Sequence, residues 1–307
     1  MRRTVASSVR FGGIGLHGGV AATAAVRPCR LGRGIRFRRV DLPVGTGDIA
    51  AHHSNIIDTQ LCTRLGNAQG ATLGTVEHLM AALAGLGITD ALIEVDGPEI
   101  PIMDGSARPF VAGLLAAGFD GAVGAPRALR ILETVEVVDG DRRAALRPAP
   151  AFSASYEIEF PEPAIGRQTL ALELTGDAVI TELADCRTFC RAGEVVQLRA
   201  MGLAKGGSLE NAIVVEGGAV LNAGGLRRAD EFVRHKMLDA VGDLALAGAP
   251  VIGHYEGVKA GHEMTAQLLR ALFDRPETWE WVRPAIGEVP HASGRARLEA
   301  PLRAAAG

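Results

Sequence analysis

The segment EFVRHKMLDAVGDL, residues 231–244, places ionisable side chains on an otherwise apolar helix. Four of them stand four residues apart, so helical geometry puts them on one stripe: Glu231, His235, Asp239 and Asp243. Large apolar residues fill most other positions and predict that the helix is buried. A buried carboxylate without a cation is costly, so the pattern indicates a metal site or a catalytic role.

His235 and Asp239 form an HxxxD pair, whose imidazole and carboxylate can reach one divalent cation from the same helix face. The competing interpretation is an ordinary ion pair or a satisfied histidine in the core. The apolar helix and the additional carboxylate of Asp243 favour the metal site. A catalytic zinc takes three protein ligands and keeps one open position, so a third ligand must come from elsewhere.

His78 is the candidate for that ligand because Glu77 precedes it on the predicted helix TVEHLMAALAGLG, residues 75–87. Consecutive helix residues point about 100° apart. The imidazole can therefore bind a metal while the carboxylate of Glu77 faces the reacting water as a general base.

His262, in VKAGHEM, begins a predicted helix just after a strand. It can donate a proton, with Asp243 as the carboxylate that keeps it cationic. A surface histidine that caps its helix is an equal alternative. Lys236 and Lys259 lie near these histidines and are candidates for binding an anion or for simple solvation. Glu231 is interpreted as a first-turn carboxylate that the helix dipole favours.

The elements that must position these residues follow an order that occurs twice. Residues 2–40 contain short alternating runs around glycines, typical of hairpins, before the helix at 75–87, a strand at 91–97 and a helix within 104–119. Glycine and proline then cluster at 120–128 and predict a linker. Paired strands, the histidine-bearing helix, a strand and a final helix follow.

The segments 78–97 and 235–257 share the order histidine, helix, small-residue end, strand and turn. We therefore predict an α+β fold of two similar domains, 1–124 and 125–307, packed helix layer to helix layer. Such packing brings the two histidine-bearing helices together, and sites commonly form at domain interfaces. The residues from about 290 are rich in Ala, Arg and Pro and predict a loose tail.

Composition narrows the class of protein. The 307 residues carry a formal net charge of −3, so nucleic acid is not an expected partner. The four cysteines lack a CxxC pair and predict reduced thiols in the cytoplasm. No charge-free apolar stretch reaches the ~18–20 residues of a membrane span, and the N-terminus does not resemble a signal peptide. The sequence predicts a soluble protein without stable membrane insertion.

Five motifs together resemble the zinc-dependent UDP-3-O-acyl-N-acetylglucosamine deacetylases of lipid A biosynthesis. They are TVEHLMAALAGLGITDALIEVDGPEIPIMDGSARPF, CRTFC, GLAKGGSLENAIVV, DEFVRHKMLDAVGDLALAG and VKAGH. GIGLHGG and LCTRL near the N-terminus fit as well, and the likeness runs in order from about residue 3 to 275. The resemblance implies two α+β domains with a zinc site between their helical layers.

The resemblance also implies the role of each site residue. One zinc ion per chain, or iron(II) in the cell, would be bound by His78, His235 and Asp239. Glu77 would act as general base on the metal-bound water. His262, oriented by Asp243, would be the general acid that protonates the leaving amine. Thr188 would donate its hydroxyl to the developing oxyanion.

Substrate contacts follow from the same resemblance. Lys236 would assist catalysis and, with Lys259, lie near the diphosphate of UDP. Phe160 and Phe189 would contact the substrate, with Phe160 near the nucleotide. An insert at about 190–215 would build an apolar passage for the acyl chain, and Arg191 stands there in place of an expected aromatic residue.

The implied reaction is hydrolysis of the acetamide of UDP-3-O-(3-hydroxyacyl)-N-acetylglucosamine, with release of acetate, by a cytoplasmic monomer. It is an early committed step of lipid A biosynthesis. The alternative is a non-catalytic sugar-nucleotide or lipid-binding protein on the same scaffold, which would need a broken site. A metallopeptidase is disfavoured because the sequence lacks HExxH.

Overall fold

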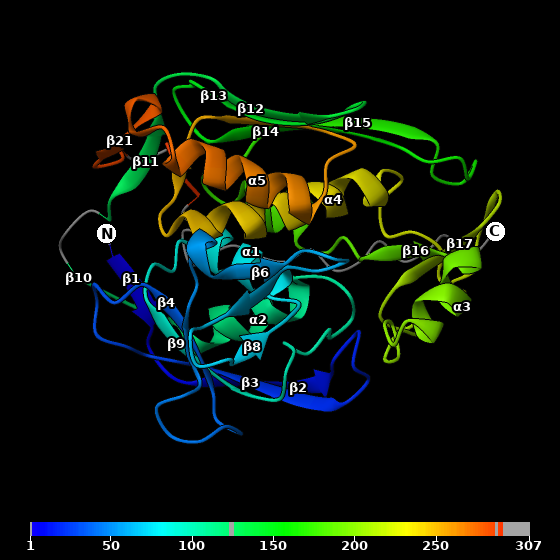
Figure 1. Cartoon of the computed structure of the whole chain (residues 1–307), viewed down its shortest axis with the longest axis horizontal. Coiled ribbons are helices and arrows are strands. Elements are labelled where there is room, and N and C mark those ends of the chain that lie inside the picture. The colour runs from blue at the N-terminus through cyan, green and yellow to red at the C-terminus, as the bar shows by residue number, and fades with distance from the viewer. Residues whose placement is uncertain (1, 123–125, 286–287, 291–307) are drawn as a thin grey trace.

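The computed structural model describes residues 2–122, 126–285 and 288–290, which form four layers in the order sheet, helices, helices, sheet (Figure 1). The inner layers contain α1 (Glu77–Gly85) and α2 (Arg108–Ala117) from the first half, and α4 (Glu231–Leu244) and α5 (His262–Phe273) from the second. The predicted domain boundary at 124/125 and, from residue 291, the tail predicted to begin at about 290 lie outside the described residues.

The sheet of the first half has five strands in the order β2-β3-β9-β4-β5. Their bounds are Val9–Ile14, Ala21–Arg27, Ala91–Asp96, Ile35–Arg39 and Asp48–Ala50. The central strand β9 pairs antiparallel with β3 and parallel with β4. Burial alternates along β3 and β9, as expected for a sheet with one face on the helices.

The sheet of the second half repeats this arrangement in the order β12-β13-β20-β14-β15. Its strands span Val135–Asp139, Arg142–Arg147, His254–Val258, Ser153–Glu159 and Arg167–Glu173. The central strand β20 is antiparallel to β13 and parallel to β14. Each sheet thus places a late strand between two earlier hairpins, and each late strand follows a histidine-bearing helix. The predicted α+β fold of two similar sheet-plus-helix units is confirmed.

The two helix layers meet where α1 packs against α4. A Cβ built at Gly242 would lie 2.1 Å from the carbonyl oxygen of Glu77, so only glycine allows this approach. Leucines and valines of both helices belong to one buried cluster that spans the two halves. The first turn of α1 and the last turn of α4 are therefore fixed against each other, and both carry candidate site residues.

Smaller elements surround these layers. An insert of β16 (Phe189–Arg191), α3 (Ala192–Ala200), β17 (Ile213–Glu216) and β18 (Ala219–Val220) extends from one side (Figure 1). Of three further sheets, one pairs β1 (Arg2–Val5) with β10 (Phe119–Ala122), and one pairs β11 (Ala128–Ile131) with β19 (Val251–Ile252) and β21 (Trp279–Val282). In the third, β7 (Arg64–Gly66) pairs with β6 (Ile56–Asp58) on one side and with β8 (Thr72–Leu73) on the other. Short helical turns lie at His53–Asn55, Val179–Leu183, Ala245–Ala247 and Pro276–Thr278.

Within the described residues, every helix is too short or too polar to cross a membrane.

Candidate active site and metal centre

His78, His235 and Asp239 come together where α1 crosses α4. One ligand atom from each lies within 4.8 Å of the others. The Nε2 atoms of His78 and His235 lie 3.5 and 3.3 Å from Oδ1 of Asp239. All three side chains are buried. The two halves of the chain therefore supply one compact set of two nitrogens and one oxygen, as the sequence predicted.

The chemistry of His235 fits a metal ligand. Its Nδ1 donates a hydrogen bond to the carbonyl oxygen of Cys186 at 3.0 Å, which leaves a lone pair on Nε2. Burial lowers the pKa of His235 to about 3, so the imidazole is neutral at physiological pH. A neutral imidazole with a fixed tautomer is the form that binds a metal ion.

Asp239 supplies a carboxylate oxygen that lacks a partner. Burial works against its charge, but the Lys236 ammonium and the cationic His262 imidazole outweigh burial and hold the pKa of Asp239 well below its usual range. Lys236 Nζ donates to Oδ2 at 2.7 Å, whereas Oδ1 is buried without a hydrogen bond among the described residues. Buried oxygens are rarely unpaired, so an ionised one facing two imidazole nitrogens fits a divalent cation.

Glu77 begins α1 and is only 3% exposed. Its Oε2 accepts the backbone N–H of Thr63 at 3.1 Å, and burial raises the pKa of the carboxyl group. The side chain lines a polar cavity of about 300 Å³ together with His78, His235 and Asp239. A carboxylate of raised basicity next to a metal site is suited to accept a proton from water.

His262 is the first residue of α5 and lines the same polar cavity. Burial lowers its pKa, but the carboxylate of Asp243, which accepts a hydrogen bond from Nδ1 at 2.7 Å, outweighs burial and raises the pKa to about 9. The imidazole is therefore a cation at neutral pH. Its Nε2 lies 4.0 Å from Oδ2 of Asp239, which directs the second N–H toward the metal site.

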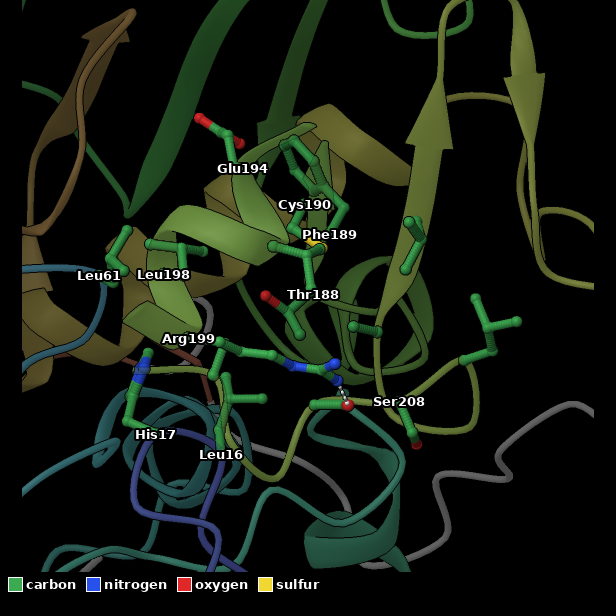
Figure 2. A pocket seen from close by; sticks show the side chains of 16 residues that line it. Leu16, His17, Leu61, Thr188, Phe189, Cys190, Glu194, Leu198, Arg199 and Ser208 are labelled. Carbon is green, nitrogen blue, oxygen red and sulfur yellow. Dashed lines mark hydrogen bonds between the residues drawn. The ribbon is translucent and has the colours of Figure 1, made fainter. Parts of the chain in front are cut away.

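A second, apolar cavity of about 320 Å³ adjoins the polar one. It lies between the insert and the segment around Leu16, as Figure 2 shows. The two cavities share four lining residues: Leu16, Leu61, Thr188 and Phe189. Thr188 therefore stands where an apolar chain in one cavity would meet the polar groups of the other. The insert predicted at about 190–215 does form one wall of an apolar cavity.

The predicted lysines differ in their positions. Lys236, predicted to assist catalysis and to lie near the diphosphate, lines the polar cavity and donates a hydrogen bond to Asp239. Lys259 has a positive φ of 48° and forms ion pairs with Asp141 at 2.8 Å and Glu159 at 2.5 Å. It is not among the described residues that line either cavity.

The two predicted aromatic contacts, Phe189 and Phe160, differ in whether they line the cavities. Phe189 lines both cavities, and its ring centroid lies 6.4 Å from that of His235. Phe160 lies behind it, with ring centroids 5.5 Å apart, and belongs to neither set of described lining residues. Arg191 is not among the described lining residues, but it forms ion pairs with Glu162 at 3.5 Å and with Glu194, which lines the apolar cavity.

Two residues without a predicted role, Thr63 and His17, contact or line the site. Thr63, in the LCTRL motif, donates its N–H to Glu77 and its hydroxyl to Asp243 Oδ1 at 2.5 Å. His17, in GIGLHGG, is 4% exposed and lines the apolar cavity, and neither ring nitrogen has a hydrogen bond among the described residues. The motifs that contain them were the only signal in the sequence, because no spacing rule connects them to the triad.

A buried triad of two histidines and an aspartate, a buried carboxylate and a carboxylate-supported imidazole are the groups that a metal-dependent hydrolase uses. The family model LpxC, described as UDP-3-O-acyl N-acetylglycosamine deacetylase, matches residues 2–274. The chain belongs to this family.

Curated proteins support the assignment over nearly the whole length. A UDP-3-O-acyl-N-acetylglucosamine deacetylase of Phenylobacterium zucineum is 52% identical over 278 residues, which cover 91% of this chain and 95% of the relative. One of Anaeromyxobacter dehalogenans is 46% identical, with 97% and 96% coverage. One of Haemophilus influenzae is 44% identical, with 92% of each chain covered. The family predicted from the five motifs is confirmed.

Proposed function

We propose that this chain hydrolyses the acetamide of UDP-3-O-(3-hydroxyacyl)-N-acetylglucosamine, an early committed step of lipid A biosynthesis. The observation that carries the proposal is the junction of the two cavities at Thr188. A substrate with a fatty chain and a polar sugar needs an apolar cavity that continues into a site for amide hydrolysis. Family membership gives the same reaction.

His78, His235 and Asp239 would hold the metal, and a set of two imidazoles and one carboxylate suits zinc or iron(II). When bound, zinc supplies Lewis-acid chemistry, polarising the acetamide carbonyl and lowering the pKa of water. The neutral state of His235 and the ionised state of Asp239 keep the donor set ready for a cation.

Glu77 accepts a proton from the attacking water as the new C–O bond forms. Its raised pKa brings its basicity closer to neutral pH, where proton transfer is most effective. The carbonyl electrons move to oxygen, and the hydroxyl of Thr188 donates a hydrogen bond to the resulting oxyanion. Thr188 suits this role because it lines the wall that both cavities share.

His262 donates its Nε2 proton to the amide nitrogen as the C–N bond breaks. The products are acetate and the free amine of the sugar. Asp243 keeps the imidazole cationic before transfer, and the pKa of about 9 means that most molecules hold this proton at neutral pH. The base and the acid thus enter the reaction in opposite protonation states, as amide hydrolysis requires.

Substrate binding is assigned by position. The acyl chain would occupy the apolar cavity, with Phe189 at its junction with the sugar site. Lys236 would assist catalysis by stabilising the ionised Asp239 and would also face the substrate's diphosphate. We keep Lys259 and Phe160 as contacts for the UDP portion, where Lys259 must exchange its two carboxylates for phosphate. We also propose a monomer in the cytoplasm, and the four free cysteines fit that compartment.

The Glu77→Ala variant tests the proposal. It should retain about one zinc per chain, since Glu77 is not a ligand, and lose activity by about 10²-fold or more. A binding protein on the same scaffold would show no activity to lose. Normal turnover by Glu77→Ala, or wild-type protein that binds no metal, would contradict the mechanism.

The His262→Ala variant tests the division between ligands and proton donor. Turnover should fall while metal content stays stoichiometric, because His262 is assigned no bond to the metal. Loss of metal from this variant would show that the ligand set is wrong.

A further inference from the structure

Glu231, the first residue of α4, is completely buried and accepts four hydrogen bonds. Its Oε1 accepts the backbone N–H and the Nε–H of Arg187, both at 2.9 Å. Its Oε2 accepts Arg187 Nη2 at 3.1 Å and the backbone N–H of Arg227 at 2.6 Å. A first-turn carboxylate that only offsets a helix dipole needs none of these contacts, so the sequence interpretation of Glu231 is incomplete.

Arg187 lies next to Thr188, the residue to which we assign the oxyanion contact. Its side chain is only 11% exposed and also donates to the carbonyl oxygen of Gly225 at 2.8 Å. Bidentate pairing fixes both the position and the plane of a guanidinium group. Because Glu231 also accepts the Arg187 backbone N–H, the carboxylate holds the main chain directly as well as the side chain.

The backbone of residues 185–188 is held along its whole length. The carbonyl oxygen of Asp185 accepts Arg227 Nη1 at 2.8 Å, and that of Cys186 accepts His235 Nδ1 at 3.0 Å. Thr188 donates its N–H to Gly105 and accepts the N–H of Ile213, both at 2.8 Å. The segment thus bridges the start of α4, the first half of the chain and the insert.

A fully buried ion pair contributes little net stability, because desolvation offsets most of its attraction. Its hydrogen-bond geometry is nevertheless strict, which suits the placement of a neighbouring group. A hydrogen-bond donor for an oxyanion must lie within a few tenths of an ångström of its productive position. Thr188 has a short side chain, so its hydroxyl follows its backbone closely.

We propose that Glu231 and Arg187 are positioning residues for the deacetylation, because their ion pair fixes the peptide that presents the Thr188 hydroxyl to the polar cavity. The inference rests on the proposed function, since its effect on turnover passes through Thr188.

The test is a double-mutant cycle with Glu231→Gln and Thr188→Val. Thr188→Val should lower kcat by about 10²-fold, the usual effect of removing one oxyanion donor. Glu231→Gln should lower kcat roughly 10-fold with KM changed less than about twofold, because a misplaced donor weakens mainly the transition state. The double variant should match Thr188→Val alone, because Glu231 has no further effect once the hydroxyl is absent.

Three outcomes would overturn the inference: multiplied losses in the double variant, unchanged kcat in Glu231→Gln, or loss of metal from Glu231→Gln. Metal loss would mean that the pair acts through His235 instead. A Thr188→Val enzyme with normal kcat would contradict the proposed role of Thr188 itself, so the two failures are distinguishable.

Arg187→Lys provides a second arm if Glu231→Gln does not fold. Lysine keeps the charge but loses the bidentate geometry, so the same fall in kcat and the same non-additivity with Thr188→Val are expected. Arg167→Lys is the matched control, because Arg167 forms a bidentate pair with Glu157 on the exposed edge of the second sheet. The control should keep wild-type kcat, and equal losses in both lysine variants would also contradict the inference.

Discussion

The Nδ1 atom of His262 lies 2.7 Å from Oδ2 of Asp243, and this bond joins the start of α5 to the last turn of α4. The other oxygen of Asp243 accepts the hydroxyl of Thr63, whose backbone N–H bonds Glu77. One residue from the first half of the chain therefore connects the proposed acid and the proposed base. The hydrogen bonds from His262 through Asp243 and Thr63 to Glu77 set the distance between the acid and the base across the metal site.

Asp243→Asn should shift the pH dependence of turnover. The Asp243 carboxylate keeps the pKa of His262 raised, at about 9, against the effect of burial. Without that charge the pKa falls, and the proton donor is lost at lower pH. Since His262 must be protonated to act, kcat declines as pH rises through its pKa, and this basic limb should move to lower pH in the variant. A kcat–pH profile with the basic limb unchanged would contradict the assignment.

Gly242→Ala should destabilise the protein and impair the site. The added Cβ would lie 2.1 Å from the carbonyl oxygen of Glu77, so α1 and α4 must separate. We expect a loss of about 1–3 kcal/mol in the free energy of unfolding, despite alanine's better helix propensity. Gly193→Ala in α3 is the control, because a Cβ there meets no atom within 4 Å. Urea denaturation of both variants provides the comparison, and equal stabilities would show that the close approach is not required.

The sequence predicted the features that depend on residue spacing within one element or on the order of elements along the chain. The spacing of His235 and Asp239 on one helix is a property of the helix itself, and the shared order of elements around His78 and His235 indicated two related units. The metal triad could therefore be assembled from two short segments. Motif resemblance added the residues that lie on separate loops, such as Thr188.

Contacts between distant segments could not be read from the sequence. Thr63 and Asp243 are 180 residues apart, and Arg187 and Glu231 are 44 apart, so no helical or strand period connects them. Lys259 shows that nearness in the sequence can also mislead. Its position near His262 suggested an anion site, but strands β12–β15 bring Asp141 and Glu159 to its ammonium group. Pairing partners are decided by the tertiary fold, which local pattern does not contain.

Arg199→Ala should change the acyl-chain preference. Arg199 lies along the apolar cavity, and its Nη2 donates to the carbonyl oxygen of Gly207 at 3.3 Å (Figure 2). The charged guanidinium of Arg199 limits how much of an acyl chain the apolar cavity can bury. Each further buried CH₂ contributes about 0.8 kcal/mol, so a chain longer by two carbons should gain up to about 15-fold in relative kcat/KM.

The measurement for Arg199 is the ratio of kcat/KM for substrates that differ by two carbons in the acyl chain. Arg167→Ala is the matched control, because Arg167 pairs with Glu157 on the exposed edge of the second sheet and neither residue is in the described lining. The ratio should change only in Arg199→Ala. An unchanged ratio there would show that Arg199 does not limit chain length.

Removal of the metal should leave a folded but less stable protein. Lys236 neutralises Asp239, and Cys186 holds His235, so two of the three ligands keep a hydrogen-bond partner without a cation. A ligand that binds only the folded state, present at 100 times its Kd, adds about 2.7 kcal/mol to the free energy of unfolding. Zinc returned to chelator-treated protein should therefore raise Tm by several degrees.

Asp239→Asn should lose this gain in Tm, because the amide replaces the unpaired anionic oxygen. Asp141→Asn, which alters an exposed partner of Lys259, should keep it. An equal zinc-dependent rise in both variants would place the metal outside the triad.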